Sequence, residues 1–191
     1  MDLMMNKPAA RISALSLSLL LLAGCATTSL TSAPESPAQS QALALIDQGK
    51  PRDAAVQLEA LANTLKGGAR AGALADAAFA WHEAGDNVRA RSLLAQVTAR
   101  QLSGASLQRF QLTSAELALA DKQPAQALAF LNESSDTVSA PLRTRWQLAR
   151  ANALQATGDA MGAATERARA HAALTGQART DNQQALSLIH I

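Results

Sequence analysis

Internal repetition is the feature that most constrains how this 191-residue chain can fold. A similar segment recurs four times, and its turn positions are Gly49, Gly85, Lys122 and Gly158. They are separated by 36, 37 and 36 residues. Five residues after each turn position lies an alanine, at Ala54, Ala90, Ala127 and Ala163. A fixed period of this length indicates one supersecondary unit that is repeated along the chain.

The residues around each turn indicate that the unit is a helical hairpin. Glycine ends a helix at little cost because it tolerates a positive φ at the C-cap. The residues that follow suit the start of a second helix, since Pro51 and Pro124 fit a first-turn position. Asp86 or Asn87 can cap the corresponding helix of the second unit. The recurrent alanine then allows two antiparallel helices to approach closely.

Composition supports an all-helical fold. The chain has no tyrosine and only 3% aromatic residues, while alanine and leucine, both strong helix formers, dominate. Helical spacing also places apolar residues on inner faces, including Trp81 and Trp146, which we expect in the core. The expected helices cover residues 38–48, 51–65, 69–84, 87–100, 105–121, 124–132, 140–157 and 160–175. A further helix capped by Asp181 or Asn182 would run to Leu186.

The amino terminus has the features of a secretory signal peptide. Lys7 and Arg11 precede an uncharged, leucine-rich segment from Ile12 to Ala23. Roughly a dozen apolar residues are too few for a membrane-spanning helix, which needs about 20. We therefore expect residues 1–24 to be removed.

The end of this segment, Leu22-Ala23-Gly24-Cys25, resembles the lipobox of bacterial lipoproteins. The resemblance implies cleavage before Cys25, a diacylglycerol on its sulfur and a third acyl chain on its new amino group. Ala26 and Thr27 follow, and the absence of an aspartate there implies export to the outer membrane. The alternative is a plain signal peptide that ends by chance on the only cysteine of the chain.

The sequence thus divides into four parts. Residues 1–24 are the lipoprotein signal peptide, and residues 25–40 are the lipidated cysteine with a flexible linker rich in Ser, Thr and Pro. Residues 41–186 form the helical repeat domain. Residues 187–191, SLIHI, resemble translated sequencing-adapter read-through and are interpreted as a truncation artefact; the alternative is a genuine short apolar terminus.

The charged residues and histidines point to no nucleic-acid, catalytic or metal site. Removing Asp2, Lys7 and Arg11 with the signal peptide leaves 15 basic and 14 acidic side chains, a net charge of +1. The chain has no other cysteine, so a lipidated Cys25 leaves no free thiol. His82, His171 and His190 are scattered, and His82 is expected to be a partly exposed structural residue. We expect no catalytic residues, no cofactor and no metal.

Two further groups of charged residues are open to more than one reading. Glu83 and Asp86 lie near a turn, where helix capping explains them better than acid–base catalysis. Five arginines make the fourth hairpin basic, which indicates either a solvated face or a surface for an acidic partner. They are Arg143, Arg145, Arg150, Arg167 and Arg169.

The hairpins resemble tetratricopeptide-like repeats, most closely where residues 80–86, AWHEAGD, lead into residues 90–94, ARSLL. The period is two or three residues longer than usual and Lys122 replaces a turn glycine, so the resemblance is to the superfamily. It implies a solenoid of about four hairpins whose concave face binds proteins or peptides.

The lipidated terminus, the linker and the repeats together resemble the amino-terminal part of the LppC/LpoA family, outer-membrane lipoproteins that activate penicillin-binding proteins. Residues 115–120, 145–150 and 182–186 carry the resemblance within the stretch from about Arg109 to Leu186. The family implies a bifunctional penicillin-binding protein as partner. It also implies a larger carboxy-terminal domain of periplasmic-binding-protein type, where partner contacts could lie.

Two other functions remain open at this stage. A tetratricopeptide lipoprotein could serve outer-membrane protein assembly or pilus biogenesis. A peptidoglycan hydrolase would need a catalytic dyad, which this sequence does not provide. The expected function is therefore a non-enzymatic, lipid-anchored scaffold in peptidoglycan synthesis.

Overall fold

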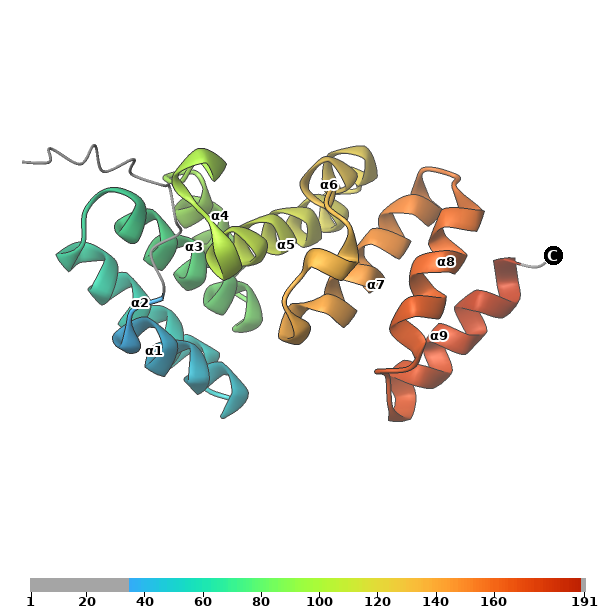
Figure 1. Cartoon of the computed structure of the whole chain (residues 1–191), viewed down its shortest axis with the longest axis horizontal. Helices are drawn as coiled ribbons and strands as arrows, with labels where there is room; N and C mark the ends of the chain where they lie inside the picture. Colours follow the sequence, from blue (N-terminus) through green and yellow to red (C-terminus); the bar gives the residue numbers. More distant parts are fainter. Residues whose placement is uncertain (1–34, 190–191) are drawn as a thin grey trace, which may run out of the picture. The chain divides into compact units, whose positions relative to one another are not determined.

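The computed structural model describes residues 35–189, which form nine α-helices and two short 3₁₀ helices with no β-strand among them (Figure 1). This confirms the all-α prediction. The helices are α1 (Pro37–Asp47), α2 (Pro51–Thr64), α3 (Gly67–Glu83), α4 (Asn87–Leu94), α5 (Gly104–Ala120), α6 (Pro124–Phe130), α7 (Ala140–Ala156), α8 (Ala160–His171) and α9 (Gly176–Ile189). The 3₁₀ helices are η1 (Ala99–Gln101) and η2 (Ser135–Thr137). The predicted signal peptide, the lipobox and the linker up to residue 34 lie outside the described residues, as do residues 190 and 191.

The four predicted turns share one backbone geometry. Each joins two helices through three residues, and the middle one has a positive φ: 72° at Gly49, 79° at Gly85, 59° at Lys122 and 90° at Gly158. At every turn the middle N–H donates to the carbonyl three residues back, and the next N–H donates to the carbonyl five residues back. This is the Schellman motif, which satisfies carbonyls left free at a helix end. Lys122 therefore adopts the conformation that glycine supplies in the other three turns.

The recurrent alanines are all fully buried. Ala54, Ala90, Ala127 and Ala163 each have an exposed fraction of 0%. In chain order, α1 packs on α2, α3 on α4, α5 on α6, and α7 on α8. Because these positions are shielded from solvent, a larger side chain there would have to displace its neighbours.

Replacing Ala127 with leucine should destabilise the protein by about 1–3 kcal/mol, because extra methylene groups in a filled interior force neighbouring side chains and backbone to shift. Urea denaturation followed by circular dichroism would measure the change. Ala125→Leu is the matched control, since Ala125 is exposed on the same helix and should tolerate leucine. Equal effects of the two changes would contradict a filled interior at Ala127.

The first helices of the pairs recur with the same period as the turns. The helices α3, α5, α7 and α9 begin at Gly67, Gly104, Ala140 and Gly176, which are 37, 36 and 36 residues apart. The helix α9 is therefore in register with the first helix of each preceding pair. We expected this helix to begin near Asp181 or Asn182, with one of them as its cap. It begins at Gly176 instead, and both residues lie inside it. Asn182 is buried and donates from Nδ2 to the carbonyl of Arg167 at 3.1 Å.

Two predicted helices are shorter than expected because the chain turns to bury an apolar residue. The helix α4 ends at Leu94, not at residue 100, and Val97 is buried in the turn that follows. Likewise, α8 ends at His171, and Leu174 is buried before α9 begins. At the other end, α1 begins at Pro37, so residues 37–40 of the predicted linker are helical.

The core is formed mostly by alanine, with a few large side chains. The helix α3 packs against α1, α2, α4 and α5, and its residues 71–81 are all buried. Trp81 and Trp146 are 2% and 0% exposed, which confirms that both belong to the core. One apolar cluster is formed by residues of the helices from α1 to α5. A second cluster surrounds Trp146 and has residues mainly on α5, α6 and α7.

Candidate functional site

The predicted lipidation site, Cys25 with Leu22, Ala23 and Gly24, lies in the part of the chain that the structure does not describe. Within residues 35–189 the notable polar features are clusters of charged side chains between helices. We name three of them by a central residue: the Asp76 cluster, the Arg145 cluster and the Arg150 cluster.

The Asp76 cluster joins the start of α1 to α3 and α5. Asp76 on α3 is fully buried, and its carboxylate accepts hydrogen bonds from Arg109 Nε at 2.7 Å and Arg109 Nη2 at 3.0 Å. Gln39 Nε2 on α1 donates to the same carboxylate at 2.5 Å, and Ser106 Oγ on α5 donates at 3.2 Å. Arg109 Nη2 also donates to Glu35, the residue before the N-cap of α1.

The charge of Asp76 is buried away from solvent and is paired with the charge of Arg109. Burial raises the pKa of the Asp76 carboxyl, and the neighbouring Arg109 and Gln39 oppose that shift. A buried charge is tolerated only when it is paired and hydrogen-bonded. With four donor contacts on its two oxygens, Asp76 meets that condition through Arg109, Gln39 and Ser106.

The Arg145 cluster joins α7 to α5 and α3. Arg145 on α7 binds Glu116 on α5 in a bidentate pair, with Nε–Oε1 at 2.5 Å and Nη2–Oε2 at 2.7 Å. Its Nη1 donates to Glu83 on α3, and its guanidinium carbon lies 5.4 Å from the centre of the Phe79 ring. His82 completes the cluster, because its Nε2 lies 3.1 Å from Glu116 Oε2.

The contacts of His82 favour its protonated form. Its Nδ1 lies 2.7 Å from Asn87 Oδ1, so both ring nitrogens face oxygen atoms. The hydrogen bond to Glu116 raises the pKa of His82, and this outweighs burial, which lowers it. Burial would raise the pKa of Glu116, yet the hydrogen bonds from His82 and Arg145 hold it below its ordinary value. His82 was expected to be a partly exposed structural residue; its side chain is 17% exposed, but its acidic partner on α5 was not foreseen.

The raised pKa of His82 predicts a pH dependence of stability. The folded state holds the proton more tightly than the unfolded state, so the stabilisation is fully present below the unfolded pKa of about 6.5. It is lost as the pH rises through the folded pKa. We expect the free energy of unfolding of the wild type to fall relative to that of His82→Gln as the pH rises above about 6.5. Urea titrations of both proteins would measure this difference, and parallel pH profiles would contradict it.

Arg109 and Arg145 occupy the same position in successive repeats. They are 36 residues apart, and each is the sixth residue of its helix. In both cases the guanidinium reaches back to a carboxylate on the preceding first helix, Asp76 for Arg109 and Glu116 for Arg145. Sequence reasoning missed this pairing. Two signals could have revealed it: the 36-residue spacing of the arginines, and an aspartate within an alanine-rich run.

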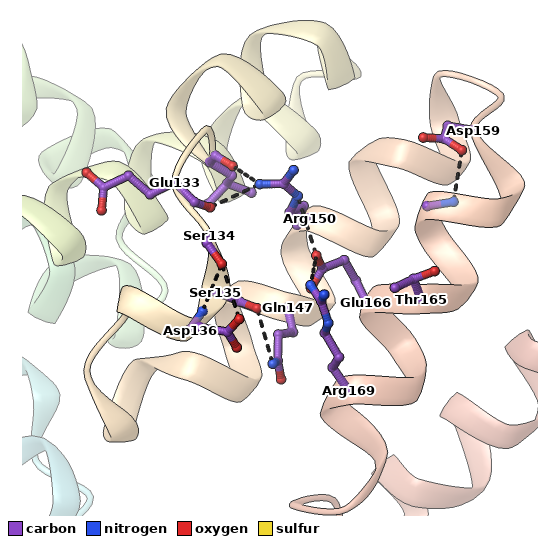
Figure 2. Close-up of polar contacts among 12 residues, drawn as sticks. Glu133, Ser134, Ser135, Asp136, Gln147, Arg150, Asp159, Thr165, Glu166 and Arg169 are labelled. Carbon is purple, nitrogen blue, oxygen red and sulfur yellow. Dashed lines mark hydrogen bonds and ion pairs between the residues drawn. The ribbon is translucent and has the colours of Figure 1, made fainter.

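The Arg150 cluster ties the loop after α6 to α7 and α8 (Figure 2). Arg150 Nη1 donates to the carbonyls of Leu131 and Glu133 at 2.7 and 3.0 Å. On its other side, Glu166 Oε1 lies 3.7 Å from Arg150 Nε and 3.1 Å from Arg169 Nη1. Gln147 Nε2 also donates to the buried Ser135 Oγ at 3.4 Å.

All five arginines of the predicted basic face have contacts within the chain. Beyond Arg145, Arg150 and Arg169, Arg143 donates to the carbonyl of Val138, and Arg167 Nη2 donates to Asn152 and Gln155. The contacts of Arg143, Arg145, Arg150 and Arg167 connect helices or hold loops, whereas Arg169 pairs with Glu166 on its own helix. The arginines therefore have structural partners in addition to any role on the surface.

The turn near Trp81 shows which acidic residues cap helices. Asp86 is the N-cap of α4 and accepts from Arg89 N at 3.0 Å, as expected, whereas Glu83 pairs with Arg145. The guanidinium carbons of Arg89 and Arg52 lie 4.5 and 5.9 Å from the centre of the Trp81 ring, and its Nε1 donates to Glu59. Arginines from two helices thus cover this buried ring.

The charged side chains of the three clusters connect helices to one another. The carboxylates of Asp76 and Glu116 are held by two-point arginine contacts, so their oxygens are already engaged by partners within the fold. Among residues 35–189, no group of three or more His, Cys, Asp and Glu side chains is placed to hold a metal ion. No helix in this part of the chain is long and apolar enough to cross a membrane.

Comparisons of the chain with protein-family models, with curated proteins and with solved structures found no match.

Proposed function

We propose that the protein is a lipid-anchored scaffold on the periplasmic face of the outer membrane, where it activates a bifunctional penicillin-binding protein. The observation that carries this proposal is the combination of one cysteine, at the end of Leu22-Ala23-Gly24-Cys25, with a domain of repeated helix pairs. Two or more acyl chains give stable attachment, whereas a single chain does not. The protein acts in this account by placing a partner, and it performs no chemistry itself.

We further propose that the helix pairs stack as a tetratricopeptide-like solenoid. Four Schellman turns of the same geometry and first helices that recur every 36 or 37 residues support this arrangement. So do the contacts between first helices, α1 with α3, α3 with α5, and α5 with α7. In such a stack each repeat contacts mainly its neighbours, which leaves an extended surface for a protein partner.

The choice of partner follows from the resemblance to the LppC/LpoA family. The matching stretch, from about Arg109 to Leu186, includes Glu116, Arg145 and Trp146, all of which lie between helices. These residues support the arrangement of the repeats, so the contacts with a synthase would use other, exposed side chains or a domain beyond this chain.

Capture from membranes tests the proposed partner. The tagged, lipidated protein would be cross-linked in living cells, purified, and the captured proteins labelled with a fluorescent penicillin. We expect a labelled band of the size of a bifunctional synthase, absent when the tag is placed on an unrelated outer-membrane lipoprotein. Capture of outer-membrane assembly or pilus components, with no penicillin-labelled band, would favour the alternative scaffold function instead.

A further inference from the structure

We propose that Arg109 latches the start of α1 and thereby sets the length of chain between the lipid and the folded domain. This inference rests on the proposed lipid anchor at Cys25. The latch is the contact of Arg109 with Glu35, at the point where the predicted linker meets the first helix.

The contact joins parts of the chain that are distant in sequence. Glu35 and Arg109 are 74 residues apart, and the Arg109 side chain is 10% exposed. Because Asp76 holds the same guanidinium through two hydrogen bonds, Arg109 has little freedom to turn away. Glu35 therefore meets a donor that the rest of the fold has already fixed in place.

The helix α1 depends on this polar attachment because it buries little else. Of its 11 residues only Gln39 and Ala42 are buried, and Gln39 itself belongs to the Asp76 cluster. Leu43, Leu45 and Ile46 add partly buried contacts towards the other end of the helix. A helix of this length is marginal on its own in water, so its contacts decide whether it stays folded.

The state of α1 decides how far the domain can lie from the membrane. Glu35 lies ten positions after Cys25, and ten residues at full extension reach at most about 35 Å. If α1 opened, the free chain would extend to Pro51 at the start of α2, and its maximum reach would rise to about 90 Å. Holding Glu35 thus limits the chain between the proposed lipid and the folded helices to the residues before Glu35.

The test is hydrogen exchange, measured by mass spectrometry on the full lipidated protein in vesicles of phosphatidylethanolamine and phosphatidylglycerol. Glu35→Gln weakens the latch but keeps the pair between Arg109 and Asp76. We expect peptides from α1 to exchange about 3- to 10-fold faster, since the amide oxygen of glutamine can still accept from Arg109 but lacks the charge that strengthens the hydrogen bond. Peptides from α7 should not change. Asp47→Asn, which removes an acidic group at the other end of α1, is the matched control and should exchange like the wild type.

Two results would separate this inference from the proposed function. Wild-type exchange of α1 in the Glu35→Gln protein would overturn the latch. In the same samples, an amino-terminal peptide without acyl groups would overturn the lipoprotein function, whereas faster α1 exchange in that sample would still support the contact between Glu35 and Arg109.

Discussion

Replacing Arg109 with methionine is expected to destabilise the protein by about 3–5 kcal/mol, because it leaves the buried carboxylate of Asp76 without its charged partner. Methionine keeps most of the length of the side chain, so loss of packing contributes little. The remaining donors, Gln39 and Ser106, are neutral and cannot compensate a buried negative charge. Chemical denaturation monitored by far-ultraviolet circular dichroism would measure the loss.

Two comparisons isolate the effect of the buried charge. Arg91→Met removes the same side chain from the exposed pair with Asp121, where both side chains are more than 40% exposed, and should cost less than about 1 kcal/mol. Combining Arg109→Met with Asp76→Asn removes both charges and should recover part of the loss. If Arg109→Met cost no more than Arg91→Met, Asp76 would not depend on its arginine.

Replacing Cys25 with serine is expected to remove the protein from the outer membrane almost completely. Serine has no thiol to carry a diacylglycerol, so the proposed lipid attachment could not form. Density-gradient separation of inner and outer membranes, followed by immunoblotting, would show the change. The wild type should band with the outer membrane, and Cys25→Ser should be absent from that band.

Thr27→Ser is the matched control for this experiment, because it changes a nearby hydroxyl residue and leaves the lipobox intact. It should band with the wild type. If Cys25→Ser remained in the outer-membrane band in the same amount as this control, the cysteine would have no role in attachment.

Features set by neighbouring residues could be predicted from the sequence. The Schellman turns at Gly49, Gly85 and Gly158 require only a residue that tolerates positive φ after a helical segment, and both parts are visible locally. Even Lys122 was placed correctly, because the period of 36 or 37 residues put it at the turn. The buried alanine five residues later follows from the same period.

Features that depend on which helix faces meet could not be predicted. The partner of Arg109 is 33 residues away on α3, and Arg145 reaches 62 residues back to Glu83. Before the helices are packed, such arginines look like ordinary solvent-facing residues. The early end of α4 has a similar cause, since it depends on a tertiary position for Val97.

Mass spectrometry of the amino-terminal peptide of the mature protein, purified from its native membrane, tests the central claim most directly. The account predicts that the peptide begins at Cys25 and carries a diacylglyceryl group on sulfur and an acyl chain on nitrogen. A peptide that begins at another residue, or at Cys25 with an unmodified thiol and amine, would contradict it.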